Sequence, residues 1–136
     1  MSDFTRSAGF RTSVQEISGC EQAARRAALS YQVQGLAGVE VFELAGEWSS
    51  RADTRSMWAV KLSALSRIEC VIDDDADLEV AVRQLTRFQD AGWKVWALVP
   101  LRRLAGAHRV FQPVAEYVQG WWASHDSIAF TAPEIP

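Results

Sequence analysis

The stretch of sequence that decides the fold spans residues 67–100 and reads RIECVIDDDADLEVAVRQLTRFQDAGWKVWALVP. Its first part, 67–73, contains the β-branched residues Ile68, Val71 and Ile72, which favours a strand. Acidic residues then begin a helix, and Gly92 is a typical residue at which such a helix ends. Residues 93–99 are apolar on both faces except for Lys94, which is typical of an interior strand. A strand, a helix and a second strand in this order predict a right-handed parallel crossover.

The residues before this stretch predict one helix and two strands. Ser13 is the expected cap of a helix over 13–34, because Glu16 stands three residues further on, at the capping-box distance. Alternating apolar residues predict strands over 38–44 and 57–63. Only a short link separates the second of these from the next strand, which suits an antiparallel hairpin.

The residues after the stretch predict one long helix. Apolar residues recur every three or four positions over 101–124, and Pro113 breaks or kinks the helix. A short edge strand over 127–131 is an optional last element. The order αβββαβα, with this edge strand at its end, predicts an α/β protein: a flexible N-terminus over 1–12, and a single domain with a mixed central sheet over 13–136.

Composition narrows the class of protein. The chain has 136 residues, a length that fits one domain, and its net charge of −3 argues against a protein that coats nucleic acid through general basicity. A local basic patch remains compatible with that charge. Cys20 and Cys70 have no metal-ligand spacing and are expected to be structural thiols in a reducing compartment. Without a visible signal peptide or an apolar run of about 20 residues, the sequence predicts a soluble cytoplasmic protein with no membrane contact.

Four aspartates gather where the strand 67–73 gives way to the helix. They are Asp73, Asp74, Asp75 and Asp77. Ligands bind beyond the carboxyl ends of strands in open α/β sheets, and carboxylate oxygens suit Mg²⁺ or Ca²⁺. The first three are therefore candidate metal ligands, with Mg²⁺ the expected cofactor. The alternative is that these acids are solvated, and that Asp74 or Asp75 caps the helix.

Four arginines lie near this turn and are candidates for contacts to phosphate or nucleic acid. Arg83 and Arg87 fall on the predicted helix, and Arg102 and Arg103 follow the next strand. The alternative is an ordinary solvated helix face.

The six tryptophans are a second unusual feature. The densest aromatic group is Tyr117, Trp121 and Trp122, expected on the helix over 101–124. Two adjacent tryptophans cannot both face one core stripe of a helix, so one of them is predicted to contact a partner, most simply in a homodimer. The alternative is that all three belong to the core.

The order αβββαβ over residues 13–122 resembles the core of the restriction-endonuclease-like PD-(D/E)xK superfamily. The residue pattern of the helix and of the strand after it, over 81–100, supports the resemblance. Gln84 with Phe88 is similar to the Gln-x-x-x-Tyr helix motif of one branch. The segment 71–85 also looks like the first strand and acidic turn of a response-regulator receiver domain. The strand over 127–131, which would have to supply its phosphoacceptor, ends without an aspartate.

The nuclease resemblance implies two acids that hold a divalent cation, and a lysine two residues after the second acid. Asp53 and Glu69 match the acids, but Val71 stands where the lysine is expected. The catalytic motif is therefore degenerate unless Lys61, on the neighbouring strand, takes the place of that lysine. The sequence predicts a non-catalytic binding or assembly module. The alternative is a metal-dependent nuclease or phosphohydrolase that uses Asp53, Glu69, Asp73 and Lys61.

Overall fold

The computed structural model describes residues 18–44 and 57–136. Ser13, Glu16 and Asp53, which entered the predictions above, lie outside these residues, as does the segment 1–12. The elements are α2 (Gly19–Val33), β2 (Val39–Leu44), β3 (Met57–Leu62), η1 (Ser63–Leu65), β4 (Arg67–Val71), α3 (Leu78–Asp90), β5 (Lys94–Pro100), η2 (Leu101–Arg103), α4 (Leu104–Val110), β6 (Tyr117–Ser124) and β7 (Ser127–Phe130).

Within the described residues the strands form one six-stranded mixed sheet, in the order β2-β3-β4-β5-β6-β7. The pairs β2–β3, β3–β4 and β6–β7 are antiparallel, and the pairs β4–β5 and β5–β6 are parallel. The predicted α/β class, the single domain and the mixed sheet are therefore confirmed. The crossover expected in residues 67–100 is also present, since α3 joins the parallel strands β4 and β5.

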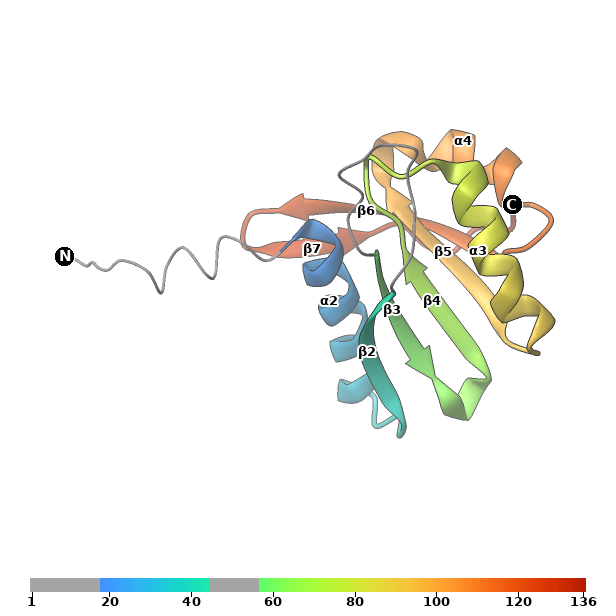
Figure 1. Ribbon diagram of the computed structural model, residues 1–136. Helices are drawn as coiled ribbons and strands as arrows, with labels where there is room; N and C mark the ends of the chain where they lie inside the picture. Colours follow the sequence, from blue (N-terminus) through green and yellow to red (C-terminus); the bar gives the residue numbers. More distant parts are fainter. Residues whose placement is uncertain (1–17, 45–56) are drawn as a thin grey trace.

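The helices cover the two faces of the sheet (Figure 1). Helix α2 packs on β2, β3 and β4 from one side, whereas α3 and α4 pack on β5 and β6 from the other. Successive side chains of a strand point to opposite faces. The register aligns Glu69 of β4 with Trp96 of β5, and Trp96 with Tyr117 of β6, so these three residues share the face on which α2 lies. In the described part of the chain, no helix has the length and apolar character needed to cross a membrane.

Helix α2 begins later than the sequence predicts. Ser18 is its N-cap, and the Ser18 hydroxyl accepts a hydrogen bond of 3.1 Å from the backbone N–H of Glu21. Ser18 and Glu21 have the same three-residue spacing that makes Ser13 and Glu16 resemble a capping box. The buried face of the helix is made of small residues, which let it approach the sheet closely; they are Cys20, Ala23, Ala24, Ala27 and Ala28.

The cap of α3 is Asp77, so neither Asp74 nor Asp75 has the capping role expected for one of them. The Asp77 carboxylate accepts hydrogen bonds from the N–H groups of Glu79 (2.9 Å) and Val80 (3.3 Å). A turn precedes the helix, closed by the bond of 3.2 Å from the Ala76 N–H to the Asp73 carbonyl. That turn moves the start of the helix further along the chain.

The prediction of one long helix over 101–124 is wrong. Its first part is helical, as η2 and α4, but the chain then turns and forms the strand β6, which pairs with β5 and β7. Pro113 has no N–H to continue a helix, and the following residues, with valine and three large aromatics, favour a strand. Val118 and Gly120 are buried, at the two-residue period of a strand. The edge strand expected over 127–131 is confirmed as β7.

Candidate functional site

A buried polar cluster joins α2 to the sheet. Glu69 of β4 is 1% exposed and is the one charged residue of the described chain that is buried. The Tyr31 hydroxyl of α2 donates a hydrogen bond to the Glu69 carboxylate. Nη2 of Arg67 lies 3.1 Å from Oε2 of Glu69 and donates to the Tyr31 hydroxyl oxygen at 2.8 Å. Each of the three side chains therefore contacts the other two.

Burial raises the pKa values of the Glu69 carboxyl group and the Tyr31 hydroxyl group in this cluster. Loss of hydration raises the pKa of Glu69, while the Tyr31 hydrogen bond and the Arg67 charge act in the opposite direction. Burial, together with the neighbouring Glu69 carboxylate, raises the pKa of Tyr31. Tyr31 therefore keeps its proton at neutral pH and acts as a donor to Glu69.

The guanidinium of Arg67 is also stacked on an aromatic ring. It lies 3.8 Å from the centroid of the Trp96 ring, close enough for a cation–π contact. Tyr117 packs on Trp96, with 4.8 Å between the ring centroids and 53° between the ring planes. The Trp96 indole N–H donates a hydrogen bond of 2.9 Å to Oε1 of Glu116. Arg67 is thus held in one orientation by Tyr31, Glu69 and Trp96.

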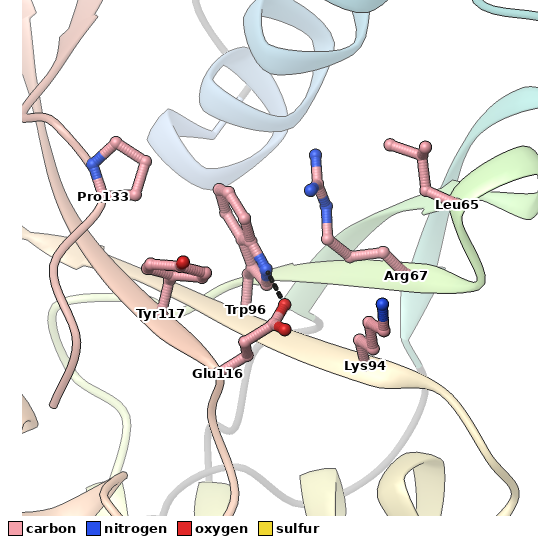
Figure 2. A pocket seen from close by; sticks show the side chains of 7 residues that line it. All are labelled: Leu65, Arg67, Lys94, Trp96, Glu116, Tyr117 and Pro133. Carbon is pink, nitrogen blue, oxygen red and sulfur yellow. Dashed lines mark hydrogen bonds between the residues drawn. The ribbon is translucent and has the colours of Figure 1, made fainter.

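These side chains form the wall of a pocket at the amino ends of β4, β5 and β6, here called the strand-start pocket. Its volume is about 550 Å³, and its lining residues are Leu65, Arg67, Lys94, Trp96, Glu116, Tyr117 and Pro133. Figure 2 shows Trp96 between Tyr117 and Arg67, with Glu116 and Lys94 beside them. The size is in the range of small-molecule sites. Nε of Arg67 is buried and has no hydrogen-bond partner, which is uncommon for a donor of this kind.

The acidic turn, by contrast, does not assemble into a metal site. Asp74 forms a bidentate ion pair with Arg102, through Nε at 2.8 Å and through Nη2. Arg103 donates to the backbone carbonyls of Asp74 (2.9 Å) and Ala76 (2.7 Å). Among the residues that the structure describes, no three acids, histidines or cysteines lie close enough together to hold a metal ion. The candidate ligands Asp73, Asp74 and Asp75 are therefore not brought together.

The candidate phosphate contacts separate into two pairs. Arg102 is paired with Asp74 although its side chain is 72% exposed, and Arg103 donates to backbone carbonyls of the acidic turn. Arg83 and Arg87 lie exposed on α3. The four arginines therefore do not form one phosphate site in this structure.

The candidate catalytic residues do not converge either. Val60 is paired directly with Glu69 in the β3–β4 register, so those two residues share a face of the sheet, and Lys61 points to the opposite face. There the Lys61 ammonium lies 3.2 Å from Oε1 of Glu40 and 5.9 Å from the centroid of the Trp93 ring. Lys61 therefore cannot replace the missing lysine beside Glu69, and Asp53 lies outside the described residues.

The three aromatic residues predicted at a partner surface have different environments on β6. Tyr117 belongs to the strand-start pocket. Trp121 packs against the first turn of α2, where a side-chain carbon added to Gly19 would lie 3.1 Å from the Trp121 ring. Trp122 is 37% exposed and, beside Leu101, lines a second pocket of about 470 Å³ at the opposite end of the parallel strands.

The sequence does not indicate the residues of the buried polar cluster or of the strand-start pocket as a site. Tyr31 and Trp96 match the apolar patterns of a helix and an interior strand, and Glu116 belongs to no motif. One local signal is present: Lys94 is the single polar residue of an otherwise apolar strand. Comparisons of the chain with protein-family models, with curated proteins and with solved structures gave no match.

Proposed function

We propose that this protein is a non-catalytic binding module, and that the strand-start pocket binds the carboxylate or phosphate group of a small molecule. The observation that carries the proposal is the fixed position of Arg67 at the pocket wall. Tyr31 and Glu69 hold one nitrogen of its guanidinium, and Trp96 holds its face. A preorganised cation costs little ordering when a ligand binds.

A second cation strengthens the case for an anionic ligand. Lys94 lies opposite Arg67 in the β4–β5 register and lines the same pocket. Lys94 forms no ion pair with any described residue. A carboxylate or phosphate placed between Lys94 and Arg67 would be bound by charge-assisted hydrogen bonds, which are stronger than neutral ones.

The environment of Glu69 supports a non-catalytic role. A catalytic metal ligand needs access to the ion and to the substrate. Glu69 is sealed beneath Tyr31 and Arg67 instead, and its carboxylate is already occupied by both. The relation of this scaffold to the restriction-endonuclease-like core remains a prediction, supported by the order α2, β2, β3, β4, α3, β5 and by no matching relative. The metal-dependent alternative has no supporting geometry in the described residues.

Nuclear magnetic resonance tests the proposal directly. Addition of millimolar benzoate or inorganic phosphate to the ¹⁵N-labelled full chain is expected to shift the indole N–H of Trp96 and the backbone amides around Lys94 and Glu116. The Lys94→Gln variant should weaken both effects, while Arg87→Gln, which changes an exposed arginine on α3, should leave them unchanged. An absence of shifts at the pocket with both anions would refute the proposal.

The predicted assembly concerns a different surface. Trp122 and Leu101 are exposed at 37% and 43%, and they adjoin each other at the second pocket. This apolar patch supports the prediction of a homodimer, since tryptophan is enriched at interfaces. The cytoplasmic location likewise stays a prediction.

A further inference from the structure

Two opposite charges face the strand-start pocket without neutralising each other. Lys94 and Glu116 both line the pocket and are both exposed. The ion pairs of the described residues do not include one between them, nor one between either residue and another side chain. Most exposed ion pairs are weak, but oppositely charged side chains around a pocket of this size can be satisfied together by one ligand.

The Glu116 carboxylate is held in place with one oxygen still open. Its Oε1 accepts the hydrogen bond from the Trp96 indole N–H, and the backbone N–H of Glu116 donates to the Val95 carbonyl at 2.7 Å. No described residue donates a hydrogen bond to its Oε2. A carboxylate fixed in this way offers an acceptor to a ligand at little cost in side-chain ordering.

We infer that the ligand is a small zwitterion of the α-amino-acid type, an inference that rests on the proposed function. Its carboxylate lies between Arg67 and Lys94, and its ammonium group donates to Glu116. An apolar side chain contacts Tyr117 and Pro133, which line the pocket on the other side of Trp96 from Arg67 (Figure 2). The pocket volume of about 550 Å³ leaves room for a large side chain.

Three molecules with the same apolar part measure how much the carboxylate and the ammonium group each contribute to binding. Phenylalanine carries both groups, 3-phenylpropionate lacks the ammonium, and 2-phenylethylamine lacks the carboxylate. Isothermal titration calorimetry of the full chain at neutral pH should give an affinity for phenylalanine at least about tenfold above that for either analogue. A factor of ten is the contribution of one modest additional charge-assisted contact.

Two variants test which side chain of the pocket binds each charged group of the ligand, and each variant has a matched control. Glu116→Gln keeps an oxygen for the Trp96 indole, and should reduce phenylalanine binding to the level of 3-phenylpropionate while leaving 3-phenylpropionate unaffected. Lys94→Gln should weaken both carboxylates. The controls Glu79→Gln and Arg87→Gln remove the same charges from the exposed face of α3, and should change none of the three affinities.

The outcomes separate this inference from the proposed function. If 3-phenylpropionate binds as tightly as phenylalanine, or if Glu116→Gln leaves phenylalanine binding unchanged, the ligand is a simple anion and the zwitterion inference is refuted. The inference also fails if benzoate binds in the pocket and phenylalanine does not. If none of these molecules, nor phosphate, binds there, the proposed function itself fails.

Discussion

Replacement of Arg67 by methionine tests the energetics of the buried polar cluster. The Arg67 side chain is 15% exposed, and its removal leaves the Glu69 carboxylate, 1% exposed, without its counter-charge. Breaking a buried pair by deleting one partner costs about 3–5 kcal/mol. We expect a loss near the lower end, about 3 kcal/mol at pH 7, because Tyr31 still donates to Glu69 and because Glu69 can take up a proton.

The pH dependence follows from the direction of the Glu69 shift. Burial raises the pKa of Glu69 above its ordinary value of 4.5, and loss of Arg67 raises it further. The folded variant then binds a proton that the unfolded chain releases above pH 4.5, so stability falls as the pH rises from that value towards the folded-state pKa. The slope is at most about 1.4 kcal/mol per pH unit. Because Arg67 keeps the pKa of Glu69 lower in the wild type than in the variant, wild-type stability falls less over this range, and the Arg67→Met penalty is smaller at pH 5 than at pH 7.

Urea unfolding followed by far-ultraviolet circular dichroism measures these free energies at both pH values. The double variant Arg67→Met with Glu69→Gln has no buried charge to leave unpaired, so it should be at least about 1 kcal/mol more stable at pH 7 than Arg67→Met alone. Arg87→Met, on the exposed face of α3, serves as the control and should stay within about 0.5 kcal/mol of the wild type. A penalty below about 1 kcal/mol, or one that is equal at both pH values, would contradict the assignment of Glu69 as a charge neutralised by Arg67.

Three further outcomes are expected. Gly120→Ala should destabilise the fold by about 1–3 kcal/mol, because the added carbon would lie 2.9 Å from Cδ1 and 3.2 Å from Cα of Leu101. Gly106→Ala should instead stabilise α4 by up to about 1 kcal/mol, because the added carbon meets no atom within 4 Å beyond its chain neighbours and the local helix backbone; chemical denaturation compares the two variants. Millimolar Mg²⁺ at constant ionic strength should leave the melting temperature unchanged, because Asp74 is paired with Arg102 and the described residues bring no three candidate ligands together; a rise would restore the magnesium prediction. Light scattering at high micromolar concentration should detect a dimer that Trp122→Gln dissociates, and a monomeric wild type would remove the basis for the interface.

The parts of the fold that local signals determine can be predicted from the sequence. The crossover unit over 67–100 is recognisable because an acidic turn, an amphipathic helix, Gly92 and a continuous apolar strand follow one another directly. Residues 101–124 are not, because Leu104, Phe111 and Val118 match a helical period although the last of them belongs to a strand. Pro113 is the signal that separates the two elements, and its effect on the backbone outweighs the apparent period.

The strand-start pocket and the buried polar cluster beside it could not be predicted for a different reason. Tyr31, Arg67, Trp96 and Glu116 come from four separate parts of the chain and share no motif. They meet because the parallel register of β4, β5 and β6 aligns the amino ends of these strands, and because α2 lies across the same face. Register is set by the packing of the whole sheet, so a single sequence gives no information about such a cluster.

The strand order has a consequence for folding kinetics. Each strand of the described sheet pairs with its neighbour along the chain, so no pairing has to wait for a distant segment. The longest span among these strand pairings, from Arg67 to Lys94, is 27 positions, and a shorter span costs less loop-closure entropy. The Tyr31–Glu69 bond joins residues 38 positions apart and is the longer closure. We therefore expect the sheet to be largely formed in the folding transition state, and the docking of α2, which completes the polar cluster, to follow it.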